Sequence, residues 1–416
     1  MGPIAIFDKS FLQSLSIDES VWFDNFFMSN ICPVFYVETL ADLEKNVREG
    51  RTPEQEVRII ADKTPEMHAE PNMFHHELCV GSLLGQKVTM DGRPILSGGR
   101  PTKGGGKKGF VFDPPPEAEA FSRWKNEEFL EVERKFAKQW REAIQSIDFD
   151  KVSYWLRSIG VELKKCKSLD EAKLYAESIV NGRSNPLARM KFVFTLLGIP
   201  PQYFMQVYYG WGNLGCPPLS KFAPYAAHVL TLELFFYISI SSSLISAERK
   251  TNKSDLAYLY YLPFCMVFIS SDRLHRRCAP LFLRDDQEFI WGQDLKDDLG
   301  KIDLHFDKLP MSEKEKGLHA IATHPPTDGE YLTSKLWDKF LPRWRHTLVN
   351  RQPPMPGPAS QRLLEEMKKF TNGEPISPHE IDFDSESADA LVLKRKVHKR
   401  KGKWWQIAKA IEADTE

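Results

Sequence analysis

The sequence predicts an α/β protein whose parallel sheet is interrupted by a long, mainly helical insertion. In the first 50 residues, short apolar runs alternate with segments of helical spacing, which is typical of strand–helix units that build a parallel sheet. A similar pattern resumes near residue 222 and includes the apolar run 264–269. The chain between these two parts is dominated by charged segments with helical spacing.

The N-terminal part predicts two strands, each followed by a helix. Residues 4–7 form a short apolar run closed by Asp8, and apolar side chains recur at helical spacing over residues 10–27. Residues 34–37 form the second apolar run, and we expect them to be the second strand. Glu38 then opens the next helix.

Composition divides the chain into three regions. The predicted α/β domain covers residues 1–50 and 222–300, the insertion covers 51–221, and a mixed C-terminal extension covers 301–416. Residues 92–109 are rich in glycine and lysine, which indicates a loop.

The overall composition identifies no partner. Lys and Arg (56) nearly balance Asp and Glu (57), so bulk charge indicates neither nucleic acid nor a membrane. The six cysteines form no CxxC pair and the N-terminus resembles no signal peptide, which indicates reduced thiols in a cytoplasmic protein. The apolar stretch 223–247 is long enough to span a bilayer. Its serines, His228 and Glu233 favour a buried core helix instead, so no membrane contact is expected.

Four carboxylates are predicted at one edge of the sheet. Asp8 and Glu38 follow the first two strands, Asp255 begins a helix, and Asp272 follows the run 264–269. The carboxyl ends of parallel strands share one edge, so these side chains should converge there. Converging carboxylates repel one another unless a hard cation neutralises them, which predicts bound Mg²⁺ or Mn²⁺.

These segments resemble the motifs of PIN-domain (PIN/FEN-type) nucleases. Residues 7–10 (FDKS) and 33–40 (PVFYVETL) resemble the first two motifs, and Asp255 and residues 269–272 (ISSD) match the third and fourth. The resemblance implies a three-layer α/β/α domain and metal-dependent hydrolysis of nucleic acid, with RNA favoured over DNA.

The resemblance also implies roles for individual residues. The four acids would be both catalytic residues and metal ligands, and Ser10 and Ser270 would support them. Asp42 lies one helical turn after Glu38 and is an alternative or additional ligand.

Two basic segments are candidates for contact with nucleic acid, although each is also compatible with a solvated surface. The first follows Asp272 and the second lies near the C-terminus; their candidate residues are Arg273, His275, Arg276, Arg277, Lys394, Arg395, Lys396 and Trp404. The second could also pair with the acidic run 380–389 that precedes it.

Other functions are open to a chain with this pattern. A non-catalytic PIN-like scaffold would use its helical insertion to bind a protein partner, a second copy of the chain or nucleic acid. An aspartate-nucleophile phosphatase is disfavoured because Ser10 stands where its second aspartate belongs. A zinc site using His75 and Cys79 is disfavoured because no second ligand pair lies nearby.

Overall fold

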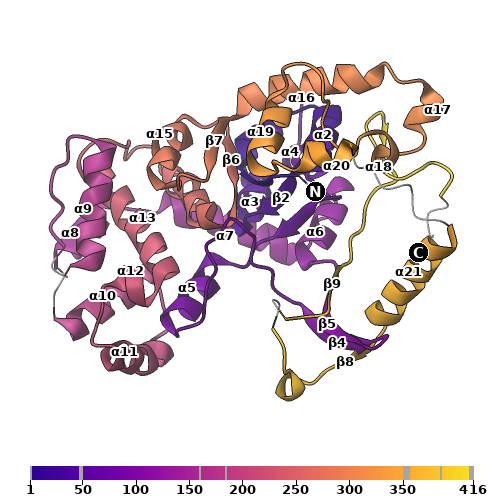
Figure 1. Cartoon of the computed structure of the whole chain (residues 1–416). Coiled ribbons are helices and arrows are strands. Elements are labelled where there is room, and N and C mark those ends of the chain that lie inside the picture. Colours follow the sequence, from indigo (N-terminus) through magenta and orange to yellow (C-terminus); the bar gives the residue numbers. More distant parts are fainter. Residues whose placement is uncertain are drawn as a thin grey trace.

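The computed structural model describes residues 2–45, 50–158, 161–182, 185–349, 357–384 and 387–411. Figure 1 shows a central parallel sheet with its helices, a helical region on one side, and a smaller sheet with α21 on the other. The predicted α/β class and the parallel sheet are therefore confirmed.

The central sheet has five parallel strands in the order β3-β2-β1-β6-β7. Its central strand β1 occupies residues 4–7, as predicted, and all four side chains are buried. Ile6 of β1 is paired with Phe268 of β6, so strands from distant parts of the chain are neighbours. The strands are β1 (Ile4–Phe7), β2 (Met28–Ile31), β3 (Ala69–Pro71), β6 (Val267–Ser270) and β7 (Glu288–Trp291).

The predicted strand at 34–37 is wrong. These residues belong to helix α3 (Pro33–Leu40), and the second strand is β2, which ends just before it. Pro33 occupies the first turn of α3, where its missing N–H costs no hydrogen bond and its fixed φ suits a helix. Glu38 therefore lies inside a helix rather than at a strand end.

The helical pattern of residues 10–27 is divided between two helices. Ser16 and Glu19 form a capping box that starts the second one, because each side chain bonds the other residue's backbone N–H. Helices and 3-10 helices (η) associated with the central sheet are α1 (Lys9–Ser14), α2 (Ile17–Phe26), η1 (Ala41–Glu44), α4 (Pro53–Lys63), α5 (His75–Leu83), α14 (Asn252–Ala257), η3 (Tyr258–Phe264), α15 (Arg273–Phe282) and α16 (Gly292–Asp307).

Residues 51–221 are mostly helical, but they also supply strands. They contribute β3 to the central sheet and a hairpin to the smaller sheet. The apolar stretch near 223 forms α13 (Pro224–Ser241), a core helix, and no helix in the described chain is long and apolar enough to cross a membrane. The other helices of this region are α6 (Pro116–Lys125), α7 (Glu131–Gln145), α8 (Phe149–Ser158), α9 (Leu169–Asn181), α10 (Pro186–Leu197), η2 (Pro201–Tyr203), α11 (Phe204–Asn213) and α12 (Leu219–Phe222).

The loop predicted at 92–109 is wrong over its second half, which forms an antiparallel hairpin. Gly105 and Gly106 connect the strands with φ values of 57° and 77°, a conformation that glycine adopts without steric cost. The smaller sheet is mixed, in the order β8-β4-β5-β9. Its strands are β4 (Arg100–Gly104), β5 (Lys107–Phe112), β8 (Glu374–Pro375) and β9 (Ala390–Leu393).

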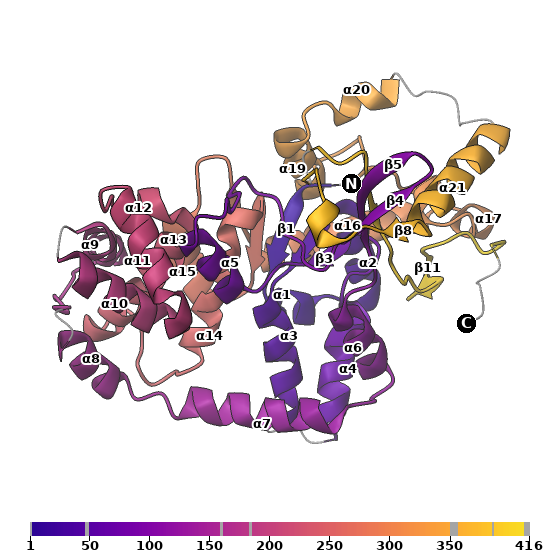
Figure 2. The same ribbon diagram turned by 90° about the horizontal axis from the view of Figure 1, so that it is seen from below.

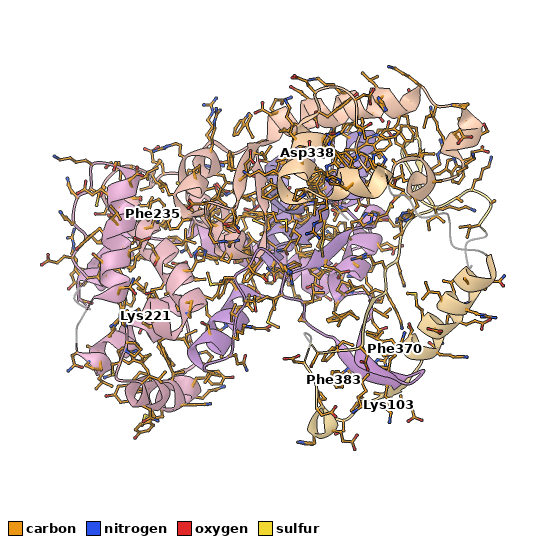
Figure 3. All side chains as sticks on the ribbon, in the orientation of Figure 1. Lys103, Lys221, Phe235, Asp338, Phe370 and Phe383 are labelled. Carbon is orange, nitrogen blue, oxygen red and sulfur yellow. The ribbon has the colours of Figure 1, made fainter. Side chains whose placement is uncertain are left out.

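The C-terminal extension packs on both sheets. Phe370 is buried where α21 packs against β4, and Figure 3 shows it beside the smaller sheet, near Lys103. A hairpin of β10 (Arg400–Lys401) and β11 (Trp404–Trp405) ends the described chain. The remaining helices are α17 (Met311–Lys314), α18 (Leu318–Ile321), α19 (Leu332–Phe340), α20 (Trp344–Val349), α21 (Gly357–Thr371) and η4 (Pro378–Glu380). All six cysteines are free thiols.

Candidate acidic site at the edge of the central sheet

Two of the predicted acids cap helices at the carboxyl ends of neighbouring strands. Asp8 follows β1 and accepts a hydrogen bond of 2.9 Å from the Phe11 backbone N–H at the start of α1. Asp272 follows β6 and accepts one of 2.6 Å from Leu274 at the start of α15. Capping alone explains an aspartate at either position, so any function must be argued from what else their carboxylates contact.

Asp8 is buried and its carboxylate is surrounded by donors. Its Oδ2 accepts hydrogen bonds from the Ser10 hydroxyl at 2.6 Å and the Ser270 hydroxyl at 2.8 Å. The His275 ring nitrogen lies 3.4 Å from the same oxygen. Burial raises the pKa of Asp8, but the hydrogen bond and charge of His275 outweigh it, so the pKa lies below its ordinary value. Ser10 and Ser270, which the resemblance named as supporting residues, thus both contact Asp8.

His275 is a buried cation beside these carboxylates. It is therefore not part of an exposed helix face, and in this conformation it is not open to contact with nucleic acid, which were the two expectations for it. Its Nδ1 is 2.8 Å from Ser270 Oγ, and its Nε2 contacts the backbone carbonyl of Asp255. Burial lowers the pKa of His275, but the hydrogen bond and charge of Asp8 raise it to about 9. The imidazolium therefore connects the strand end that carries Asp8 to the helix that carries Asp255.

Asp255 and Asp272 share one cation. Arg249 Nη2 lies 3.3 Å from Asp255 Oδ2 and 3.2 Å from Asp272 Oδ2. Both carboxylate side chains are 15% exposed, whereas the arginine side chain is 58% exposed. Asp255 Oδ2 is buried and accepts no hydrogen bond from the described residues. Burial, Glu38 and Asp272 raise the pKa of Asp255 to about 7, so its negative charge is only partly compensated.

Glu38 reaches the site from inside α3. The Tyr258 hydroxyl donates a hydrogen bond of 2.8 Å to its carboxylate. Lys9 Nζ contacts the backbone carbonyl of Glu38 and also pairs with Asp42 at 3.0 Å. Burial raises the pKa of Glu38, although Lys9 and Tyr258 oppose that effect. Asp42 is occupied by Lys9 and, at 3.8 Å, by Lys45.

The donor set of this site is chemically suited to a hard divalent cation, because it consists of carboxylate oxygens. With the side chains as they stand, no three Asp, Glu, His or Cys side chains of the described residues are placed to hold a metal ion. The space between Asp255 and Asp272 is occupied by Arg249 instead. The residues present therefore fit a metal ion only after that arginine moves.

The other predicted contact residues are distributed in different ways. Arg273, Arg276 and Arg277 are exposed on α15, where Arg276 lies over the Trp291 ring and Arg277 donates to a backbone carbonyl. In the C-terminal segment, Lys394 pairs with Asp113 and Arg395 pairs with Glu70.

Trp404 and Lys396 differ sharply in exposure. Trp404 is fully buried and donates a hydrogen bond to Asp303, so its ring has no free face on which a base could stack in this conformation. Lys396 is exposed.

Sequence reasoning missed Arg249 and Tyr258. Arg249 precedes Asp255 by six residues in a polar segment, and Tyr258 lies three residues after it in an apolar one. Neither residue lies within the short sequence motifs that identified the four acids. Only the spacing of three between Asp255 and Tyr258 could have placed the tyrosine on the same helical face.

Comparisons with protein-family models, with curated proteins and with solved structures give no match. Inference about function therefore depends on the fold and on the geometry of this site.

Proposed function

We propose that the protein is a metal-dependent nuclease that hydrolyses phosphodiester bonds, with RNA favoured over DNA. One observation carries this proposal: two partly buried carboxylates at the carboxyl edge of a parallel sheet share a single, exposed arginine as their counter-ion. Ligands of open parallel sheets bind outside this edge. Two further acids, Asp8 and Glu38, lie in the same electrostatic cluster.

Arg249 occupies the position where a cation would neutralise the site. Its side chain is more than half exposed, and exposed ion pairs typically contribute no more than about 1 kcal/mol to stability, so its displacement costs little. After displacement, Asp255 and Asp272 would present oxygens to the same point. A divalent cation would compensate two negative charges where the arginine compensates one.

Mg²⁺ or Mn²⁺ would be held by Asp255 and Asp272, with Glu38 and Asp8 beside them. When bound, such an ion activates water and stabilises negative charge on phosphate oxygens. The residues of the chain position that site: His275 fixes Asp8 relative to α14, and Tyr258 fixes the Glu38 carboxylate. Arg273 is exposed at the start of α15 and would attract the phosphate backbone.

The test is cleavage of labelled single- and double-stranded RNA and DNA with Mn²⁺ by the wild type and by Asp272→Asn. Asparagine keeps the cap of α15 but removes the charge, so we expect cleavage to fall by at least about 100-fold while the protein stays folded. Asp285→Asn, on an exposed turn, is the matched control and should cleave normally. Undiminished cleavage by the double variant Asp8→Asn/Asp272→Asn would exclude the proposed site.

A second candidate function is supported by the saturation of Asp8. Its carboxylate accepts three hydrogen bonds and faces an imidazolium, as expected of an acid that stabilises the fold without metal. In that case the chain is a non-catalytic scaffold that binds a partner through its helical region. Calorimetric titration separates the two functions, because a scaffold would bind no Mn²⁺ at millimolar concentration.

A further inference from the structure

Helix α7 from the middle region forms one wall of a small cavity beside the acidic site. Figure 2 shows α7 extending from the ends of α3 and α4 toward α8, in the helical region. The cavity has a volume of about 120 Å³. Glu38 and Lys9 line it on the side of the central sheet, and Thr251 and Ser254 line it near α14.

The residues that α7 contributes to this cavity lie on one helical face. Trp140, Arg141 and Ile144 line the cavity, and Ile144 follows the other two by four and three residues, so its side chain neighbours both of theirs. Ala137, one turn earlier, is fully buried, which fixes this face of α7 toward the domain. The Lys250 ammonium group also contacts the backbone carbonyl of Gln145, at the end of α7.

Arg141 differs from Arg134 and Lys135 of the same helix, which are paired, and from the exposed Lys138, which does not line the cavity. Arg134 pairs with Glu54, and Lys135 pairs with Glu131. Arg141 forms no ion pair or hydrogen bond with any part of the chain that the structure describes, although it lines a cavity that also contains Glu38. It is therefore available to an anion that enters from outside.

The side chain of Trp140 is also only partly buried in the fold. Its side chain is half-buried and its ring lies 6.4 Å from that of Phe136, nearly parallel to it. An indole that is partly open beside an unpaired guanidinium is the combination that recognises a nucleotide: the ring stacks on a base and the cation contacts a phosphate.

We propose that Trp140 and Arg141 form a nucleotide subsite that the middle region adds to the acidic site. This inference rests on the proposed nuclease function, because it places the nucleotide next to the four acids. The subsite takes a nucleotide of an unpaired strand. A base enters a cavity of this size only when it is free of its partner, and ligand pockets for larger molecules are typically about 300–1,000 Å³.

The experiment measures binding of a fluorescein-labelled single-stranded oligonucleotide by anisotropy, with EDTA present so that no cleavage occurs. Trp140→Ala should weaken binding by about tenfold, and Trp140→Phe should restore most of it, because phenylalanine still stacks. Arg141→Ala should weaken binding and lower the slope of log K against log salt by about one. Lys138→Ala, on the exposed face of α7, is the control for loss of one positive charge and should bind nearly as the wild type.

The outcomes separate this inference from the nuclease proposal. Equal binding by Trp140→Ala and the wild type overturns the subsite, whether or not Asp272→Asn abolishes cleavage. A loss with Trp140→Ala that Trp140→Phe does not reverse indicates a structural role for the indole and also overturns it. Trp140-dependent binding without Mn²⁺-dependent cleavage leaves the subsite standing and rejects the nuclease. An equal loss on a blunt duplex of the same length contradicts selection of an unpaired strand.

Discussion

Two regions of this protein bury acidic side chains, and they neutralise them in opposite ways. At the edge of the central sheet, Asp255 and Asp272 share Arg249, which is mostly exposed. Beside β3, by contrast, Glu66 pairs with Lys125 and Glu70 pairs with Arg395. In the second region each acid thus has a basic partner of its own from a distant part of the chain, and Glu66 also contacts His398.

The pKa shifts express the same difference. Burial raises the pKa of Glu70, but Arg395 opposes the shift through both charge and hydrogen bonding. Burial also raises the pKa of Asp255, and Glu38 adds to the shift, so that the pKa reaches about 7. The partly uncompensated charge of Asp255 supports the proposal that the acidic site binds an external cation or substrate.

A large effect should come from breaking a compensated pair. Arg395→Ala leaves Glu70 buried without its partner, and this should lower the free energy of unfolding by about 3 kcal/mol, measured by urea denaturation. The matched variant Glu70→Gln/Arg395→Met removes both charges and should recover most of that loss. If Arg395→Ala were as stable as the wild type, the pair would not hold the C-terminal segment against β3.

An effect of similar size is expected from the uncompensated acid. The pKa of Asp255 is about 7 in the folded state and near 4 when unfolded, so the folded state binds its proton more tightly over that range. The wild type should therefore lose stability as pH rises from 4 to 7, whereas Asp255→Asn does not titrate. The variant should match the wild type at pH 4 and exceed it by about 4 kcal/mol at pH 8, because each unit of pKa shift corresponds to about 1.4 kcal/mol.

The difference between the two proteins mainly reports Asp255, because Asp8 and His275 titrate in both; the charge of Asp255 also contributes to the raised pKa of His275. The pKa of His275 is raised to about 9, so its stabilising contribution is complete below its unfolded pKa and disappears as pH rises through about 9. A pH-independent difference between the variant and the wild type would show that Asp255 is fully compensated. Saturating Mn²⁺ should reduce the difference at pH 8, since it would compensate the charge in the wild type.

The sequence predicted the positions of the acids at the edge of the central sheet better than it predicted the strands and helices on which they lie. Asp8 and Asp272 follow short, buried strands as expected, although β6 begins at Val267 and the first residue of the predicted run 264–269 belongs to η3. The true second strand contains Ser29 and Asn30, which are buried polar residues, so it gave no apolar run. The run at 34–37 belongs to a buried helix, and a short apolar run does not distinguish the two.

The neutralising groups could not be found in the same way. Arg249 and His275 act through contacts that only the folded chain creates, and the sequence around them resembles an ordinary charged surface. The hairpin at residues 100–112 was missed because its glycines, typical of loops, here serve a two-residue turn. Local pattern predicts where a strand ends, but it does not predict which distant cation meets the residue that follows.

Removing the shared cation should increase the affinity of the acidic site for Mn²⁺ about fivefold. Arg249→Ala eliminates the group that competes for Asp255 and Asp272, so Mn²⁺ should bind more tightly in a calorimetric titration, by roughly 1 kcal/mol. Arg273→Ala removes an equal charge from the exposed start of α15 and controls for the general field. Weaker Mn²⁺ binding by Arg249→Ala would mean that the arginine does not occupy the metal position.

The smallest effect tests whether compensation in the second region depends on burial. Lys394 adjoins Arg395 in sequence, but its pair with Asp113 is solvent-exposed, with side chains 37% and 53% exposed. Water and salt screen such a pair, so Lys394→Ala should change the free energy of unfolding by less than about 1 kcal/mol. Lys394 and Arg395 would then differ several-fold in their contribution to the free energy of unfolding, because only Arg395 pairs with a buried acid. If Lys394→Ala lowered the free energy of unfolding as much as Arg395→Ala does, the stability of this region would depend on its total charge. Burial of the ion pairs would then not distinguish this region from the acidic site.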